Sequence, residues 1–471
     1  MYIKKGQEIT VTITDAAFEG KGIGRLGEQV VFIKNTAPGD KVTARVTRRK
    51  KKFLEARLLN VLQSGEVRTE PVCSHAGICG GCTWQHVLYE EQLRFKRQHV
   101  QDHMVRIGGL MDIDVSLVLG SDEKLYYRNK MEYTFGDRRW LTDEEIASGD
   151  PIPDKDLAAG MHIPGRFDRI LNLNECHLQI PVSWQIMDFV RDYATRLDIP
   201  PYNAIRHEGF IRNVMIRNSA VSGDLLVNIV TYEDDQEIMT SLTSALLERF
   251  QEITSVVNNV NDTWSPSSEG RYENILFGQG YITESIGGYN FKISSNTFFQ
   301  TNTKQAEKLY QVALDYAGLT GNELVYDLYC GVGSLTLFVS GHCDTAIGIE
   351  INPESIRKAE ENASENEVTN CRFETGDMKD AFTSTLFDKY GKPDVIITDP
   401  PRAGMHPGVI ATMLQTEAER IVYVSCNSAT QARDLALLQE KYHIDAIQPV
   451  DMFPQTYHIE SVAKLTLKKS R

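Results

Sequence analysis

Two segments near the C-terminal end of the chain carry side chains that can do covalent chemistry. The apolar run RIVYVS is followed directly by Cys426, and the segment DMFPQTYHIE ends at Glu460, where another strand-like run begins. A thiolate is a nucleophile and a carboxylate can accept a proton, so the pair suits nucleophilic catalysis followed by proton abstraction. A single cysteine on a buried strand is more often an apolar filler, and the surrounding motifs therefore decide its role.

A glycine turn upstream could hold a cofactor beside this pair. In VYDLYCGVGSLTL an apolar strand leads to Gly331 and Gly333, and helix-like residues follow. The next strand ends at Glu350, which is placed to bridge two ribose hydroxyls, and Gly376-Asp377 follows the third strand, where an acid suits an adenine edge. Open α/β sheets bind ligands at the carboxyl ends of their strands, so these residues predict a nucleoside-containing cofactor.

The sequence of the same turn distinguishes between the possible cofactors. Leu335 and Thr336 follow Ser334, so the third glycine of the dinucleotide fingerprint is missing, and the chain has no Walker lysine. A methyl donor is favoured over a nicotinamide, with hydride transfer as the alternative. The loop DPPRAG at 399–404 has Arg402 where enzymes that methylate amino groups usually carry an aromatic residue, which disfavours amino methylation.

Methylation of uracil at C5 needs one cysteine and one carboxylate beside the methyl donor. C5 becomes nucleophilic only after a thiolate has added to C6, and a base must then remove the C5 proton. Cys426 and Glu460 supply both groups, whereas the rival Cys330 lies in the cofactor turn. A free thiol has a pKa of about 8.5, so a neighbouring cation or base must assist, and the sequence does not identify it. Asp399 could accept the N3–H of uracil, which disfavours cytosine.

A second set of cysteines has the spacing of a metal site. Cys73, Cys79 and Cys82 crowd into a glycine-rich loop, and Cys176 is the best candidate for a fourth ligand. Four thiolates suit zinc or an iron–sulfur cluster, and the spacing alone does not choose between them. Cys343 and Cys371 are interpreted as structural.

The elements around these residues predict three domains. Residues 1–60 have short alternating strands and glycine turns, which indicate a small β-barrel of the oligonucleotide-binding type. Residues 61–290 form a central α+β domain that contains the cysteines and a helix at about 89–107, expected to pack on the catalytic domain. Residues 291–471 alternate strands and helices, as in a doubly wound, Rossmann-like α/β sheet. The pattern does not fix the topology of 136–260.

The charge distribution favours a nucleic-acid partner. The 471 residues carry a net charge of −14, but residues 1–60 contain 13 Lys and Arg against 6 Asp and Glu, with a basic run at 48–52. A basic domain on an acidic chain suits phosphate binding. No apolar run approaches the ~18 residues that a membrane span needs, and the first residues lack the apolar core of a signal peptide. We expect a cytoplasmic protein without a membrane or an obligate protein partner.

The combined motifs resemble the RNA 5-methyluridine methyltransferases, in particular the branch that modifies 23S ribosomal RNA, and residues 1–60 resemble a TRAM domain. The matching segments are CSHAGICGGCTWQ, NTFFQTN, DLYCGVGSLTL, TDPPRAG, VSCNSAT and DMFPQTYHIE. The resemblance implies S-adenosylmethionine as the methyl donor, Cys426 as the nucleophile and Glu460 as the proton acceptor. Residues that would line the cofactor and uracil pocket are Gln300, Tyr329, Ser334, Glu350, Asp377 and Asp399.

The resemblance also extends to the metal and the substrate. It implies a [4Fe–4S] cluster held by Cys73, Cys79, Cys82 and Cys176. It places Phe298 and Phe299 near a flipped base, where stacking contributes about 1–3 kcal/mol. The implied partner is RNA, with 23S rRNA favoured and tRNA as the alternative. A third interpretation is a non-catalytic RNA-binding factor in ribosome assembly that retains the cofactor fold.

Overall fold

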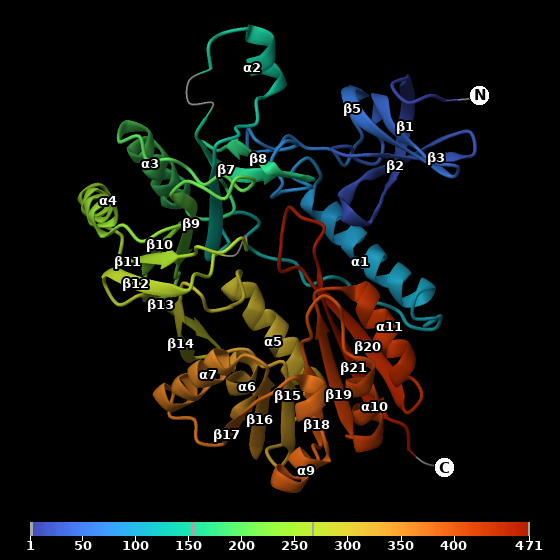
Figure 1. Ribbon diagram of the computed structural model, residues 1–471. Coiled ribbons are helices and arrows are strands. Elements are labelled where there is room, and N and C mark those ends of the chain that lie inside the picture. The colour runs from blue at the N-terminus through green and yellow to red at the C-terminus, as the bar shows by residue number, and fades with distance from the viewer. Residues whose placement is uncertain (1–2, 153–155, 266–267, 470–471) are drawn as a thin grey trace.

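The computed structural model describes residues 3–152, 156–265 and 268–469 and arranges them as a barrel, a central sheet domain and a C-terminal sheet domain (Figure 1). The barrel closes in the strand order β1-β2-β3-β5-β4. Its strands are β1 (Glu8–Ala16), β2 (Gly22–Leu26), β3 (Gln29–Ile33), β4 (Lys41–Arg49) and β5 (Phe53–Gln63). The predicted small barrel is therefore confirmed.

Alternating apolar residues build the barrel core. Ile9, Val11 and Ile13 of β1 point inward, while the residues between them are exposed. A Cβ atom at Gly22 would lie 2.1 Å from Thr36 Oγ1, so the close approach at this point requires glycine. The barrel core is therefore apolar, and the charged side chains of β1 and β4 lie outside it.

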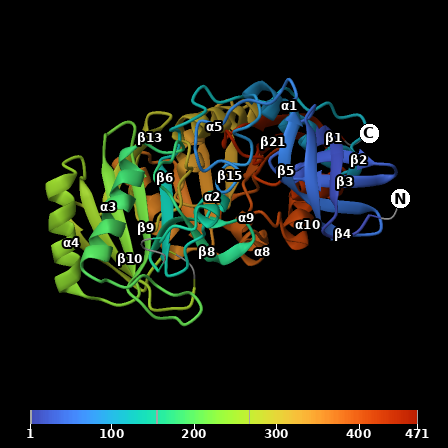
Figure 2. The same ribbon diagram turned by 90° about the horizontal axis from the view of Figure 1, so that it is seen from above.

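The central domain is a seven-stranded sheet in the order β12-β11-β10-β9-β6-β7-β8. Its strands are β6 (Lys130–Gly136), β7 (Ala158–Ile163), β8 (Arg166–Asn172), β9 (Ile211–Asn218), β10 (Leu225–Thr231), β11 (Ser255–Val260) and β12 (Tyr272–Phe277). Helices α3 (Val182–Arg196) and α4 (Gln236–Arg249) pack side by side on one face, as Figure 2 shows, and the short α2 (Asp143–Ser148) lies apart. A β13–β14 hairpin (Tyr281–Ile286, Tyr289–Ser294) leads to the next domain.

The C-terminal domain is a doubly wound sheet in the order β17-β16-β15-β18-β19-β21-β20, which confirms the predicted Rossmann-like fold. Its strands are β15 (Leu324–Leu328), β16 (Thr345–Glu350), β17 (Cys371–Thr375), β18 (Val395–Thr398), β19 (Arg420–Ser425), β20 (Tyr442–Val450) and β21 (Glu460–Leu467). Its helices are α5 (Thr303–Ala317), α6 (Ser334–Ser340), α7 (Pro353–Glu365), α8 (Met378–Ala381), α9 (Ser384–Tyr390), α10 (Pro407–Thr416) and α11 (Ser428–Leu438).

The last strand in sequence inserts between two earlier ones. The strands from β17 to β19 run parallel, whereas β21 pairs antiparallel with both β19 and β20. Because Ser425 pairs with Ser461 in an antiparallel register, the next position outward on each strand brings Cys426 opposite Glu460. The sheet topology alone therefore places these two residues side by side.

Helix α1 (Tyr89–Arg106) joins the three domains. Phe95 packs with Trp84 and Val87 against Ala16 and Ala37 of the barrel. Further along the helix, Nδ1 of His103 lies 2.9 Å from the Ser428 hydroxyl of α11. Figure 1 shows α1 beside α11. None of the helices in the described ranges is both long enough and apolar enough to cross a membrane.

Candidate active site

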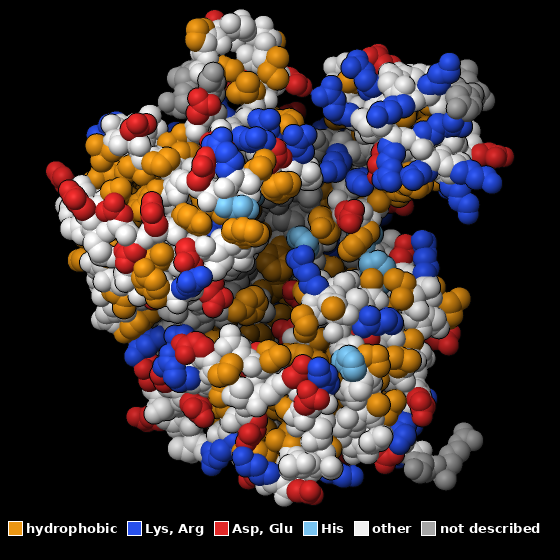
Figure 3. Space-filling view, in the orientation of Figure 1, with side chains coloured by type: hydrophobic (Ala, Val, Ile, Leu, Met, Phe, Trp, Pro, Cys, Tyr) orange, Lys and Arg blue, Asp and Glu red, His pale blue; other side chains and the backbone are white. Residues whose placement is uncertain are grey.

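A cavity of about 760 Å³ opens at the carboxyl ends of the central strands of the C-terminal sheet, and Figure 3 shows a hollow between the central and C-terminal domains. The volume lies in the range of small-molecule sites. The eight residues that the sequence places around a cofactor and a reacting base all line this cavity. They are Gln300, Tyr329, Ser334, Glu350, Asp377, Asp399, Cys426 and Glu460.

The turn after β15 leaves open space for a ligand. Tyr329, Gly331 and Gly333 all have positive φ angles, of 69°, 55° and 77°. A non-glycine residue rarely adopts this conformation, so Tyr329 marks a turn that the surroundings hold in place. A Cβ atom at Gly331 would meet nothing within 4 Å. The backbone there faces empty volume that a cofactor can fill.

Acidic side chains follow β16 and β17, at the next two strand ends. Glu350 accepts hydrogen bonds from the backbone N–H groups of Gly331 (3.2 Å) and Asn352 (3.0 Å), which fix its carboxylate beside the glycine turn. Asp377 caps α8, and its hydrogen bonds to the backbone and side chain of Lys379 lower the pKa of its carboxyl. Both acids therefore lie where hydroxyl and amino groups of a nucleoside would find acceptors.

The hydroxyl of Ser334 is already engaged within the cavity wall. It lies 2.8 Å from the hydroxyl of Tyr310, which also lines the cavity. Gln300 is held by the central domain, because the side-chain amide of Asn129 donates to the backbone carbonyl oxygen of Gln300 at 2.9 Å. The cavity wall is thus completed by residues outside the doubly wound sheet.

Charge around Cys426 controls its reactivity. Burial and the nearby Glu460 and Asp399 together raise the pKa of the Cys426 thiol to about 11, against the opposite effect of Arg402. Among the described residues that line the cavity, Arg402 alone is a lysine or arginine. It is therefore the cation that can favour a thiolate here.

The loop that carries Arg402 is tied to the loop that carries Cys426. The side chains of Asn427 and Thr430 donate to the Arg402 carbonyl at 3.0 and 3.2 Å. Asn427 also caps α11 through the backbone N–H of Ala429. The sequence motifs around Cys426 and Arg402 thus form one unit, although the sequence had not paired these two side chains.

The carboxyls of Asp399, which is half-buried, and Glu460, which is buried, complete the reacting end of the cavity. Burial raises the pKa of Asp399 to about 6. Burial and the neighbouring Asp399 raise the pKa of Glu460 well above its usual value, and Arg402 opposes this rise. Two adjacent carboxyls in one dry site share a proton, because both charges together are unfavourable there.

Other candidates from the sequence occupy different environments. Cys330 is 7% exposed and packs in the glycine turn, and burial raises the pKa of its thiol well above the usual value. Phe298 is 75% exposed in the cavity, whereas Phe299 is 3% exposed and packs against Phe291. Of the two phenylalanines, Phe298 is the one with a ring face available for stacking.

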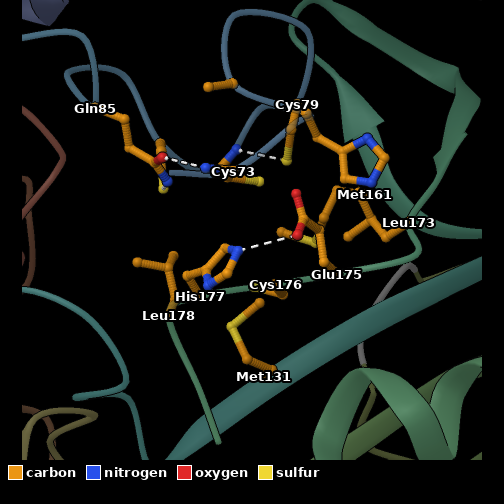
Figure 4. Close-up of a pocket in the computed structure, with 14 residues that line it drawn as sticks. Cys73, Cys79, Gln85, Met131, Met161, Leu173, Glu175, Cys176, His177 and Leu178 are labelled. Atoms are coloured by element: carbon orange, nitrogen blue, oxygen red, sulfur yellow. Dashed lines mark hydrogen bonds and ion pairs between the residues drawn. The ribbon is translucent and has the colours of Figure 1, made fainter. Parts of the chain in front are cut away.

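A second cavity is surrounded by the four predicted metal ligands, Cys73, Cys79, Cys82 and Cys176 (Figure 4). The backbone N–H of Gly81 donates to Cys79 Sγ (3.4 Å) and the Gln85 amide donates to Cys82 Sγ (3.2 Å). Burial raises the pKa of Cys79 and Cys82 to about 12. Within residues 3–152, 156–265 and 268–469, no three potential ligands converge closely enough to hold one metal ion.

Comparisons with known proteins agree across nearly the whole chain. Residues 218–469 match the tRNA (Uracil-5-)-methyltransferase family, and residues 4–59 match the TRAM domain. RNA methyltransferases described as uncharacterized, from Porphyromonas gingivalis and Chlorobaculum tepidum, are 44% and 43% identical. They cover 96% and 98% of this chain and 98% and 96% of their own lengths. The structure of Pyrococcus abyssi tRNA (uracil-54, C5)-methyltransferase with S-adenosyl-L-homocysteine has a TM-score of 0.75 and 27% identity, covering 97% of this chain and 100% of that one.

The buried Asp327 leads to a prediction about stability and pH. Burial, with smaller contributions from Asp399 and Glu350, raises the pKa of Asp327 to about 7 against the opposite effect of the Thr336 hydrogen bond. Since the folded-state pKa is raised, the carboxyl contributes most at low pH, and the contribution is lost as pH rises through about 7. The parent protein should therefore lose about 1.4 kcal/mol per pH unit relative to Asp327→Asn between about pH 5 and 6.5. Urea unfolding of both proteins measures this, and a difference that does not change with pH would contradict it.

Proposed function

The chain belongs to the tRNA (uracil-5-)-methyltransferase family and is an S-adenosylmethionine-dependent RNA uracil-C5 methyltransferase, and from this premise we propose that it acts on a specific uridine through a covalent bond between Cys426 and C6. The observation that carries the proposal is that Cys426, Glu460 and Asp399 line one end of the cavity with Arg402. Family membership overturns the hydride-transfer, amino-methylation and non-catalytic alternatives.

The proposed reaction begins at the thiol. The Cys426 thiolate adds to C6 of uracil, and the electron pair of the C5–C6 double bond moves to C5 as an enolate. C5 then attacks the methyl group that the sulfonium supplies. Glu460 removes the C5 proton, the double bond forms again, and the Cys426 sulfur leaves as a thiolate. The bond between the donor sulfur and the methyl group breaks with its electron pair on sulfur, the C5–H pair forms the new C5–C6 double bond, and the C6–S pair leaves with the Cys426 sulfur.

Arg402 is proposed as the group that stabilises the thiolate form of Cys426. Its guanidinium opposes the burial and the two acids that raise the pKa of Cys426. A positive neighbour favours the charged thiolate and also the same thiolate when it leaves. The hydrogen bonds from Asn427 and Thr430 to the Arg402 backbone keep this cation next to the nucleophile.

The paired acids divide the remaining roles. Asp399 is proposed to accept the N3–H of uracil, which cytosine lacks. A raised pKa makes Glu460 a better acceptor for a carbon-bound proton than an ordinary glutamate, once it is ionised. Gln300, Tyr329, Ser334, Glu350 and Asp377 are proposed to hold S-adenosylmethionine, and the open space at Gly331 supports this assignment.

We propose that the RNA crosses the barrel face on its way to the cavity. Lys and Arg side chains cover the barrel surface seen in Figure 3, and Lys50, Lys51 and Lys52 are exposed. Phe298 is proposed to stack on the base that enters the cavity.

The resemblance of the sequence favours 23S rRNA as substrate. A tRNA substrate is the second candidate, because the Pyrococcus abyssi relative acts on tRNA. Mapping 5-methyluridine in ribosomal and transfer RNA from a strain that lacks this protein distinguishes the two.

The four cysteines are proposed to hold a [4Fe–4S] cluster with a structural or RNA-positioning role. The thiols surround a cavity instead of converging on one point, and a cluster of eight atoms is larger than a single zinc ion. The N–H donors to Cys79 and Cys82 stabilise thiolates, which metal binding requires.

Removing each catalytic group should stop the reaction at a different stage. Cys426→Ala should give no methylated RNA and no covalent complex, because thiolate addition comes first. Glu460→Gln should form the complex and accumulate it, because the C5 proton stays in place. Denaturing gels with labelled RNA measure both species. Cys330→Ala is the matched control, since that thiol also lines the cavity, and it should retain the covalent complex. Uridine methylation by Cys426→Ala near the parent rate would disprove the mechanism.

Neutralising the exposed lysines of the barrel should reduce the salt dependence of RNA binding. In a triple Lys50, Lys51 and Lys52→Gln variant, the slope of log affinity against log salt should fall by about 0.7–0.9 per lost phosphate contact. Substituting the barrel surface keeps the packing of Ala16 and Ala37 under α1, which a truncation would expose. Lys468 and Lys469, exposed at the other end of the molecule, provide the control variant. An unchanged slope would show that these lysines do not contact RNA.

The cluster proposal predicts a brown protein. Anaerobically purified protein should contain about four iron and four sulfide per chain, by the composition of a [4Fe–4S] centre. Cys79→Ala should lose both, while Cys343→Ala, at a buried cysteine outside this cavity, should keep them. Stoichiometric zinc in a colourless preparation would overturn the cluster and leave the methyltransferase assignment intact.

A further inference from the structure

The proton acceptor is carried by an irregular segment that the rest of the molecule holds firmly. Residues 451–459, here called the strap, connect β20 to β21 and lead directly into Glu460. The strap forms no helix or strand, yet Asp451 and Met452 are fully buried and Phe453 lines the active-site cavity. Because the strap lacks the regular hydrogen bonds of a helix or strand, its position depends on contacts with other segments of the chain.

Helix α1 supplies the first anchors. The buried Lys96 donates to Asp451 Oδ1 (2.6 Å) and to the Phe453 carbonyl (3.1 Å), and the Tyr89 hydroxyl donates to Asp451 Oδ2 (2.9 Å). Both charges of the Lys96–Asp451 pair are fully buried. A buried ion pair of this kind fixes an arrangement, because separating it would leave an uncompensated charge.

Gln92 lies one turn before Lys96 and connects the strap to the end of the cysteine loop, the segment 73–87 that carries Cys73, Cys79 and Cys82. Its Nε2 lies 3.0 Å from Gln455 Oε1 and within 3.1 Å of the carbonyls of Trp84 and Val87. Its Oε1 accepts the backbone N–H of Gln455 at 3.0 Å. Gln92 is 0% exposed and does not line the active-site cavity.

The backbone at Gln455 shows that this connection determines the shape of the strap. Gln455 has a φ of 68°, a conformation that is uncommon for residues other than glycine. Its carbonyl accepts the backbone N–H groups of Thr83 (2.9 Å) and Trp84 (3.0 Å), which directly follow Cys82. The strap therefore turns at Gln455 because Gln92 and the end of the cysteine loop hold it there.

We propose that Gln92 is a positioning residue for proton removal, acting through the strap on Glu460. The proposal rests on the proposed function, in which Glu460 takes the C5 proton. Cys426 is held by a different set of bonds, through Asn427 and Arg402. Loosening the strap therefore affects the second half of the reaction and leaves thiolate addition unchanged.

The experiment measures the two halves separately on the full-length protein. RNA with tritium at C5 of uridine reports proton removal as tritium released to water, and denaturing gels report the covalent complex. Gln92→Met keeps the size of the side chain and removes all four hydrogen bonds. Tritium release should slow by about tenfold or more, since small misplacements of a catalytic group have effects of this size. The rate at which the covalent complex forms should stay within about twofold of the parent, and the complex should accumulate.

Gln101 provides a matched control on the same helix. Its amide donates to the Ile113 carbonyl (2.9 Å) and accepts from the Val115 backbone (3.0 Å), so Gln101→Met removes similar bonds that do not involve the strap. It should change neither rate. Gln455→Gly keeps the turn and removes one partner of Gln92, which gives a second variant from the side of the strap and should show the same selective slowing.

Equal slowing of both steps in Gln92→Met and Gln455→Gly, or no slowing of tritium release, would overturn the positioning role. Glu460→Gln in the same assay separates this result from a failure of the proposed function. If Glu460→Gln releases tritium at the parent rate, Glu460 is not the base. If it accumulates the complex while the two glutamine variants behave as the parent does, only the inference about Gln92 is wrong.

Discussion

The antiparallel pairing of β21 with β19 is the constraint on which the active site depends. It places the residue that follows β19, Cys426, opposite the residue that begins β21, Glu460. In a sheet made only of parallel strands, the strand beside β19 would begin at the edge opposite to the carboxyl ends. Its first residue would then lie far from Cys426. The reversed strand brings a chain segment back to the ligand-binding edge with a carboxylate at its start.

That geometry creates an electrostatic problem that Arg402 reduces. Burial raises the pKa of Cys426, Asp399 and Glu460 alike, so it disfavours a negative charge on each of these groups. The proposed reaction needs a thiolate first and a carboxylate later, so these groups must carry negative charge in turn. Arg402 lies beside two acids that share a proton. Negative charge can therefore shift between Cys426 and these acids while the total charge of the site changes little.

Local patterns in the sequence predict the parts of this site that lie at strand ends. The glycine turn before Ser334 and the acids after two strands are each fixed by residues close in the chain, and the sheet brings them to one edge. The contact of Arg402 with Cys426 and the bond between Gln92 and Gln455, 363 residues apart, have no such local signal. The sequence pattern also does not predict the topology of the central sheet, because this sheet mixes a parallel β10–β11 pair with antiparallel neighbours.

Helix α1 explains how the barrel keeps a fixed position beside the loop that carries Cys426. Its contacts with the barrel and with α11 lie four residues apart, which is about 6 Å at 1.5 Å per residue. Near its centre His99 lies 3.1 Å from the Ala16 carbonyl of the barrel, and near its end His103 contacts Ser428, two residues after Cys426. A helix cannot stretch as a loop can, so RNA phosphates on the barrel and a base in the cavity keep a constant separation. The same helix carries Gln92 and Lys96, and the position of the strap is thus set by the element that also sets the position of the RNA-binding barrel.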